Sequence, residues 1–283
     1  MESHPRSDAF DGRPMFFYHV PKSGGISVFS ALAEPLRIML MLRNRNADGS
    51  LSKAAERWIA SLIHRYDDPS QEVLPIPHML AATHLPFGLH HKLIGDYITF
   101  TVLRHPFDRT VSAYTYENMR SQNPVSLDGL KKFVNNPLNT NPMVRQFSGV
   151  DDKTPLGETH LIRAIENLCT LDHVVRIENT RTICEHLLST HHLPNVVSDR
   201  LNPTLESYRL DGSALRDEIE QANRLDMRFF VAAPVTQTEP TEPAPETQLH
   251  PLVVDIREVG DAKKSRIQVS LHSLEQYLAQ PPS

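Results

Sequence analysis

The sequence predicts an α/β fold with a mostly parallel central sheet flanked by helices, and three observations lead to this prediction. Short continuous runs of aromatic and β-branched residues recur along the chain, as expected for strands covered on both faces. Segments with apolar residues at helical spacing alternate with these runs. A glycine-rich turn joins the first run to the first helical segment. At 283 residues and 40% hydrophobic content, the chain has room for one sizeable domain and a short appendage.

The first half of the chain contains the two clearest strand patterns. One is a short aromatic and aliphatic run before the glycine turn, and the other is almost continuous in β-branched and aromatic residues. Pro106 follows the second run and favours the start of a helix, because the first helical turn needs no N–H from that residue. The predicted elements are a strand at 15–20, a turn at 21–27, a helix ending at Pro35, a helix at 51–66, a loop at 67–77, a strand at 97–103 and a helix at 107–120.

The second half continues the alternation and then changes in composition. Residues 234–251 are rich in Pro, Thr, Glu and Gln and too poor in core residues to fold, which predicts a flexible linker. The linker divides a main domain at 14–233 from a C-terminal extension at 252–283, whose role the sequence leaves open. The predicted elements are helices at 164–171, 180–188 and 213–230, strands at 174–177, 253–259 and 266–271, and a helix-like stretch at 274–278.

Composition and charge exclude several classes of protein. A formal net charge of −5 argues against a broad basic surface for nucleic acid, although it permits a local anion pocket. The two cysteines, Cys169 and Cys184, have no spacing typical of a disulfide framework or a zinc site. Residues 1–14 are polar without a signal core, and the apolar stretch 36–42 is too short to span a bilayer. We therefore expect a cytoplasmic protein without a membrane span.

The glycine turn has the composition of an anion-binding loop. Gly24 and Gly25 let backbone N–H groups converge, and the helix that follows adds about half a positive charge at its N-terminus. Lys22 precedes the glycines, whereas a P-loop NTPase has the order GxxxxGK[ST]. The turn is therefore either an anion cradle without the pattern of a P-loop NTPase or an ordinary strand-to-helix turn.

A second segment adds polar groups at the end of the next strong strand. Arg104 directly follows the strand, at the edge where open α/β sheets bind ligands. Ser112 comes eight positions later, about two helical turns into the next helix. A guanidinium and a hydroxyl at these places are able to bind one phosphate together.

These two segments resemble the motifs of a known family. Pro21-Lys-Ser-Gly-Gly-Ile-Ser27 is similar to the PK[TS]GG[TS]S loop of PAPS-dependent sulfotransferases, where PAPS is 3′-phosphoadenosine 5′-phosphosulfate. Residues 103–114 resemble the LRDPxxRxxSxY segment that holds the 3′-phosphate. Residues 83–88 and 141–149 resemble the GHxPFG and NxQxRxxSG segments of the carbohydrate branch, which includes heparan sulfate 2-O-sulfotransferase and its bacterial relatives. The resemblance spans about residues 14–233.

The resemblance implies a P-loop-like sulfotransferase fold and a reaction without a metal ion. Sulfuryl transfer from PAPS to an acceptor hydroxyl, of a carbohydrate or another small metabolite, would leave PAP as the product nucleotide. His84 matches the general base of this branch, and Lys22 matches the residue that stabilises the leaving oxygen. The donor-binding residues implied by the family are Lys22, Ser23, Gly24, Gly25, Ile26, Ser27, Arg104 and Ser112.

Three residues depart from the family pattern. Ile26 replaces a hydroxyl residue, His105 stands where the family usually has Asp, and Met143 replaces the usual Gln. The pattern leaves open whether Asn141 and Arg145 contact the nucleotide or the acceptor. It also predicts Glu178 as a buried, paired carboxylate near the nucleotide or in a structural role.

Other functions are compatible with parts of the pattern. An inactive nucleotide-binding or interaction protein would have the same fold, and a small-molecule kinase would need ATP and magnesium. A histidine metal site at His84, His90 and His91 lacks a second ligand cluster, and no GxSxG motif supports a serine hydrolase. Residues 36–79 are the expected place for acceptor specificity, because loops on a fixed scaffold usually discriminate substrates. The acceptor and the oligomeric state are not encoded in any motif that we find.

Overall fold

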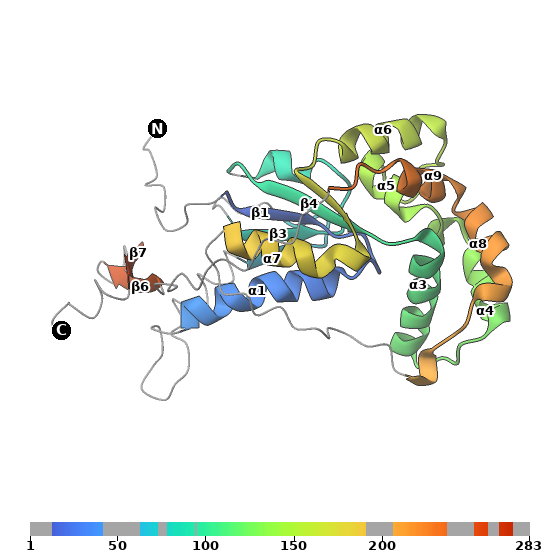
Figure 1. The fold of residues 1–283 in the computed structure, drawn as a ribbon, viewed down its shortest axis with the longest axis horizontal. Coiled ribbons are helices and arrows are strands. Elements are labelled where there is room, and N and C mark those ends of the chain that lie inside the picture. Colours follow the sequence, from blue (N-terminus) through green and yellow to red (C-terminus); the bar gives the residue numbers. More distant parts are fainter. Residues whose placement is uncertain are drawn as a thin grey trace.

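Five parallel strands form the central sheet of the chain. The structure is a computed structural model that describes residues 13–41, 63–72, 78–93, 95–190, 206–236, 252–259 and 266–273. The sheet order is β2-β3-β1-β4-β5 (Figure 1), and every neighbouring pair is parallel. The strands are β1 (Met15–Tyr18), β2 (Ile63–Tyr66), β3 (Leu80–Thr83), β4 (Ile98–Leu103) and β5 (His173–Arg176). The predicted α/β class with a parallel central sheet is confirmed.

Helices cover both faces of this sheet (Figure 1). Successive residues of β1 point to opposite faces, so Phe17 packs in one core cluster and Phe16 in the other. Phe17 stacks on Phe100 of β4, with ring centroids 4.8 Å apart. The first face is covered by α1 (Gly25–Met41) and α7 (Thr180–Thr190), and the second by α5 (Pro142–Ser148), α6 (Glu158–Leu168) and α9 (Arg224–Ala232).

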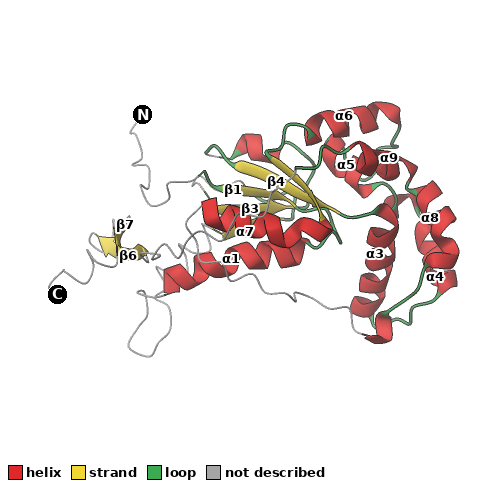
Figure 2. Ribbon diagram, viewed as in Figure 1, coloured by secondary structure: helices red, strands yellow, loops and turns green. Residues whose placement is uncertain are grey.

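A third core cluster lies beyond the carboxyl end of the sheet, where helices pack on one another (Figure 2). Its helices are α3 (Pro106–Ser121), α4 (Leu127–Val134) and α8 (Arg216–Ala222). The 3-10 helices between these elements are Leu89–Lys92, Pro137–Asn139, Ile177–Asn179, Glu206–Tyr208 and Ser213–Leu215. This helical layer holds the start of α3 beside the end of β4.

Two predicted boundaries in the first half are wrong. Helix α1 continues through Pro35 to Met41, because more than two turns already precede the proline and extending a helix costs less than nucleating one. Residues 63–66 are strand β2 and not the end of a helix. Ile63 and Tyr66 are three residues apart, a spacing that fits a helix, and only the pairing with β3 decides for a strand. The rest of the predicted helix at 51–66 lies outside the described residues.

Other elements differ because tertiary contacts outweigh local preference. Strand β3 was not predicted, since its two alanines give it little β-propensity, and α4 and α5 were not predicted either. The helix expected at 213–230 is divided at Asn223, whose side chain accepts a hydrogen bond from the backbone N–H of Asn141. Helix α6 begins at Glu158, before the predicted start.

The C-terminal extension contains an antiparallel hairpin. Its strands are β6 (Leu252–Val259) and β7 (Arg266–Ser273), which confirms both strand patterns. The helix-like stretch at 274–278 lies outside the described residues. Before the extension, Thr236 pairs with β5, because its N–H donates to the carbonyl of Val174 at 2.8 Å and its hydroxyl accepts from the N–H of Val174 at 3.0 Å. Among the helices that the structure describes, none is long and apolar enough to span a membrane.

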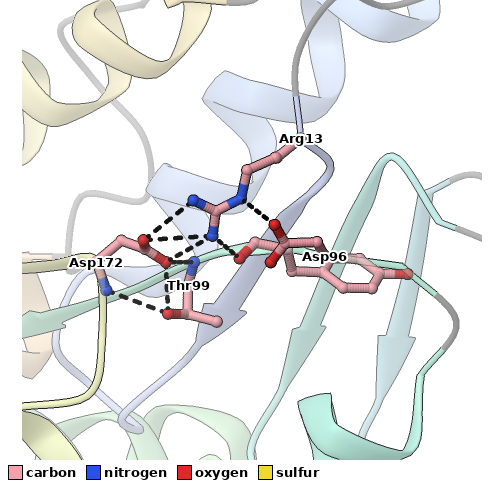
Figure 3. A network of polar contacts seen from close by, with 5 residues as sticks. Arg13, Asp96, Thr99 and Asp172 are labelled. Atoms are coloured by element: carbon pink, nitrogen blue, oxygen red, sulfur yellow. Dashed lines mark hydrogen bonds and ion pairs between the residues drawn. The ribbon is translucent and has the colours of Figure 1, made fainter.

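A polar network ties the amino ends of three strands together (Figure 3). Arg13 donates to the carbonyl of Tyr97 at 2.6 Å and forms ion pairs with Asp96 at 3.2 Å and Asp172 at 3.3 Å. Asp172 in turn accepts hydrogen bonds from the N–H and the hydroxyl of Thr99, at 2.8 and 2.9 Å. The charges at this edge of the sheet are therefore paired with one another.

Candidate active site

A cavity of about 950 Å³ opens at the opposite edge, where the parallel strands end. Open α/β sheets bind ligands at this carboxyl edge. The strand ends β1 to β4, the start of α1 and the segment after β5 all contribute side chains. The cavity is lined by His19, Pro21, Lys22, Gly24, Gly25, Ile26, Ser27, Ala31, Arg65, Asp67, His84, Arg104, Ser112, Tyr116, Ile177, Glu178, Thr180, Arg181 and Cys184.

Strand register brings three titratable side chains into a row. Tyr66 of β2 and Tyr18 of β1 both pair with Thr83 of β3. The next residue of each strand therefore lies beside the next residue of its neighbour, which aligns Asp67, His84 and His19. The imidazole centroids of His19 and His84 are 4.3 Å apart.

The glycine turn after β1 has the backbone of an anion cradle. Lys22 and Gly24 both adopt the left-handed region, with φ of 69° and 78°. Helix α1 starts directly after them at Gly25, so its free N–H groups face the cavity end of the turn. A Cβ on Gly25 would lie only 1.8 Å from Cδ2 of His19, so no larger residue fits without a shift of that ring.

Two cations that line this cavity form no ion pair with the carboxylates of the described residues. Lys22 Nζ lies 3.5 Å from the ring centroid of Tyr116, and Arg104 donates to the carbonyl of Lys22 at 3.4 Å. Burial, with a further contribution from Arg104, lowers the pKa of Lys22, and burial lowers the pKa of Arg104. Within the described part of the chain, no carboxylate oxygen lies within 4 Å of either cation. Such a pair of desolvated cations is suited to an anionic ligand.

The two ring nitrogens of His84 contact a carboxylate and a guanidinium. Its Nδ1 is 2.9 Å from Asp67 Oδ1, and its Nε2 is 3.5 Å from a terminal nitrogen of Arg65. Burial lowers the pKa of His84, the nearby carboxylate of Asp67 raises it, and Arg65 lowers it, with a lowered pKa as the result. His84 is therefore neutral near pH 7 and able to accept a proton.

His19 is held neutral more strongly. Burial, the neighbouring His84, Arg65 and Lys22 lower the pKa of His19 to about 2. Its Nδ1 is 3.2 Å from a terminal nitrogen of Arg65, and a guanidinium only donates, so Nδ1 is the acceptor and Nε2 carries the hydrogen. The sequence prediction missed His19, although its position at the end of the strand before the glycine turn was a usable signal.

The structure brings most of the predicted site residues together. All the predicted residues except Ser23 line the cavity, and these are Lys22, Gly24, Gly25, Ile26, Ser27, His84, Arg104 and Ser112. The Ser23 side chain is buried outside the lining, and its hydroxyl has no hydrogen-bond partner among the described residues. Glu178 lines the cavity but is exposed, so the prediction of a buried carboxylate is wrong, because it follows β5 at the open rim. In the part of the chain that the structure describes, no group of His, Cys, Asp and Glu side chains is arranged to hold a metal ion.

The segment 141–149 supports the fold and does not line the cavity. The Asn141 carboxamide accepts from the N–H groups of Leu225 and Asp226, both at 3.0 Å, and so caps α9. Met143 is fully buried in the core. Arg145 donates to two backbone carbonyls of the loop after α5, at 2.7 and 2.9 Å. The contacts of Asn141, Met143 and Arg145 in this structure are therefore structural, and none of the three lines the cavity.

Two residues of the 103–114 segment also have structural roles. His105 is the N-cap of α3, and its Nδ1 accepts the N–H of Phe107 at 3.3 Å, a role that the usual Asp would also perform. Arg109 is 3% exposed and donates to the hydroxyl of Thr110 and the carbonyl of Asn139. Arg104 and Ser112 are the residues of this segment that reach the cavity.

Comparison with known proteins agrees with this geometry. A family model described as "Sulfotransferase family" matches residues 8–230. The chain belongs to the sulfotransferase family. Its membership supports sulfuryl transfer in general as the chemistry of the cavity, and the matched residues include all the cavity-lining side chains. This sulfotransferase has no match of significance among curated proteins. Among solved structures it is similar to a sulfotransferase from Alicyclobacillus acidocaldarius, with 11% identity over 77% of this chain and 96% of that chain, and a TM-score of 0.36.

Proposed function

We propose that this sulfotransferase moves a sulfuryl group from PAPS to a hydroxyl of a carbohydrate or another small metabolite. The observation that carries the proposal is the pair of cations Lys22 and Arg104 beside the N-terminus of α1, which have no carboxylate within 4 Å among the described residues. Phosphate and sulfate oxygens would satisfy these charges and the free N–H groups of the helix. The donor PAPS carries such groups at both its 5′ and 3′ positions.

The residues of the cavity fit this donor. The left-handed backbone at Lys22 and Gly24 turns the chain around the start of α1, which supports binding of the 5′-phosphosulfate there. Arg104 and Ser112 line the cavity from the end of β4 and from α3, and we assign the 3′-phosphate to them. The buried Ser23 hydroxyl, without a partner among the described residues, is a further donor close to the cradle.

The proposed reaction is an in-line displacement at sulfur. His84 takes the proton of the acceptor hydroxyl while the acceptor oxygen attacks sulfur, and the bond from sulfur to the bridging phosphate oxygen breaks. Lys22 then stabilises the negative charge left on that bridging oxygen, and PAP is the product. A positioned base contributes typically ~10²–10⁴-fold to the rate, and the remainder comes from orientation and charge stabilisation.

Acceptor binding is assigned to the side of the cavity next to His84. Arg65 and Asp67 enter the cavity from the segment 36–79, which supports this segment as the source of acceptor specificity. The volume of about 950 Å³ is large enough for a nucleotide and part of an acceptor. Replacing the segment with that of a relative tests the assignment, because an unchanged acceptor preference would refute it.

Calorimetric titration with PAP tests the donor site directly. We expect micromolar binding of PAP by the wild-type chain, much weaker binding of ATP, and loss of PAP binding in Arg104→Ala. The matched control is Arg120→Ala, which removes the same charge from an exposed position on α3 and leaves PAP binding unchanged. Absence of PAP binding, or a preference for ATP, would contradict the proposal and favour a kinase or a scaffold.

Transfer activity separates an enzyme from an inactive relative. The chain is incubated with ³⁵S-labelled PAPS and a panel of oligosaccharides and small hydroxyl metabolites, and label in the acceptor is measured. We expect transfer to at least one acceptor and none with His84→Ala. PAP binding without transfer to any acceptor would indicate a nucleotide-binding protein that has lost catalysis.

A further inference from the structure

The carboxylate of Asp67 contacts the imidazole of His84, the proposed general base. Asp67 Oδ1 lies 2.9 Å from His84 Nδ1, and neither the family motifs nor the sequence pattern singled out Asp67. In nucleophilic and general-base catalysis a third group often orients the histidine in this way. The contact is therefore a candidate for a positioning role.

The parallel sheet dictates this contact. Asp67 is the first residue after β2, and His84 is the first after β3, where Tyr66 and Thr83 are register partners. The Thr83 hydroxyl also donates to the carbonyl of Tyr66 at 2.6 Å, which fixes the two strand ends against each other. The carboxylate and the imidazole are therefore held by two adjacent strand ends and not by a loop.

The contacts on the two ring nitrogens require the same tautomer of His84. A carboxylate only accepts hydrogen bonds, so the Nδ1 facing Asp67 carries the hydrogen. A guanidinium only donates, so the Nε2 that faces Arg65 at 3.5 Å has the lone pair. Arg65 also forms an ion pair with Asp67, whose second oxygen lies 3.4 Å from Arg65 Nε.

We propose that Asp67 is a positioning residue of sulfuryl transfer, which holds His84 as the Nδ1–H tautomer so that Nε2 receives the acceptor proton. Arg65 keeps Nε2 unprotonated until the acceptor hydroxyl takes its place. The proton passes from the acceptor oxygen to Nε2, and the Asp67 carboxylate stabilises the imidazolium that forms. This assignment rests on the proposed base role of His84.

The charges around His84 predict opposite shifts of its pKa in two variants. Among the described residues, the titratable groups in contact with the ring are Asp67 and Arg65 from the end of β2 and His19 from the end of β1. Asp67 raises the pKa of His84 and Arg65 lowers it. Removing the carboxylate should therefore lower the pKa further, and removing the guanidinium should raise it.

Nuclear magnetic resonance of the full chain, with ¹⁵N-labelled histidines, measures the tautomer without donor or acceptor. Signals of His84 are identified by their loss in His84→Gln. We expect the Nδ1–H form in the wild type, a mixture of tautomers and a lower pKa in Asp67→Ala, and a higher pKa with the Nδ1–H form retained in Arg65→Gln. The matched control is Asp68→Ala, because the neighbouring Asp68 is fully exposed and hydrogen-bonds Ser70 instead.

The rate of transfer to an acceptor found in the panel supplies the second readout. In Asp67→Ala we expect kcat to fall roughly ten- to hundredfold, part of the contribution of a general base, with KM within about threefold. The acid limb of the pH profile should move to lower pH, which a purely structural loss would not produce. An Nε2–H form in the wild type, or a tautomer and pKa unchanged in Asp67→Ala, would overturn the proposal. The tautomer and the pKa of His84 are measured without a donor, so they do not depend on its identity, which the PAP titration tests separately.

Discussion

At the amino edge of the sheet, Arg13 is paired with Asp172 and Asp96, whereas at the carboxyl edge Lys22 and Arg104 have no carboxylate within 4 Å among the described residues. At both edges, charged side chains lie next to the ends of the strands. Among the described residues, Lys22 and Arg104 at the carboxyl edge are partly desolvated and form no direct ion pair, although the charges of Asp108 and Glu178 still act on Arg104. Desolvated charge without a partner costs free energy of folding, so a fold retains it where a ligand supplies the missing charge. The comparison predicts that variants at the carboxyl edge reduce function and variants at the amino edge reduce stability.

Lys22→Ala is expected to have the largest effect. We expect sulfuryl transfer to fall roughly 10²–10³-fold, because the variant removes the ammonium that we propose stabilises the charge of the leaving oxygen. Thermal stability should be unchanged or higher, because the lost ammonium is partly buried and its burial lowers its pKa. Transfer assays and thermal unfolding measure the two effects, with the exposed Lys153→Ala as control. Normal transfer, or a large fall in Tm, would break the distinction between the edges.

Gly25→Ala tests the shape of the cradle. The new Cβ would collide with the His19 ring, so the ring or the start of α1 must move. We expect PAP affinity to fall on the order of 100-fold, the equivalent of one or two hydrogen bonds to a charged group. Titration calorimetry measures this loss. Gly157→Ser is the control, since a Cβ at Gly157 meets nothing within 4 Å and φ there is −151°. Equal losses of PAP affinity in both variants would mean that Gly25 has no special role in binding PAP.

The pH dependence of stability sharpens the comparison further. The pKa of His19 is lowered to about 2, so below its ordinary value of 6.5 the unfolded chain binds a proton that the folded chain does not. Stability is therefore lost as pH falls, by about 2 kcal/mol between pH 7.5 and pH 5. In His19→Asn this part of the pH dependence should disappear, which urea unfolding at several pH values measures. Parallel curves for the two proteins would contradict the buried neutral histidine.

Local sequence predicted the parts of the site that sit next to strong strands. β1 is rich in aromatic residues and β4 is almost continuous in β-branched and aromatic residues, so the glycine turn and Arg104 could be placed at their carboxyl ends. His19, Arg65 and Asp67 were missed for a different reason. They meet His84 only through the register of β1, β2 and β3, and β2 and β3 are four-residue strands with weak patterns.

Family motifs also carry residues whose role is structural. His105 and Asn141 lie in motif segments, yet each caps a helix, and Met143 is fully buried in the core. A motif records which residues recur and not which of them reach the ligand. Only the placement of each side chain relative to the cavity separates these roles.

The smallest of these effects belongs to the amino edge. Asp172 accepts two hydrogen bonds from Thr99 and pairs with Arg13, and its side chain is 32% exposed. We expect Asp172→Ala to lower the free energy of unfolding by about 1–2 kcal/mol, the cost of leaving the N–H and hydroxyl of Thr99 unpaired. PAP affinity should not change, because this network lies at the opposite end of the strands from the cavity. Urea unfolding and PAP titration check the two halves of this prediction.

Acid pH and a matched variant make the same test stricter. Burial by itself raises the pKa of Asp172, but hydrogen bonds from Thr99 and the charge of Arg13 outweigh it, so the pKa is lowered. The carboxylate therefore stabilises the fold above its ordinary pKa of 3.8, and this contribution is lost as pH falls through the lower folded value. Wild type and Asp172→Ala should converge in stability at that acid pH.

Asp96→Ala is the matched variant, because it removes an 84% exposed partner of the same Arg13. It should lower the free energy of unfolding by at most about 0.5 kcal/mol. If Asp172→Ala instead weakened PAP binding, the two edges would be coupled through the strands, and the amino edge would belong to the functional site.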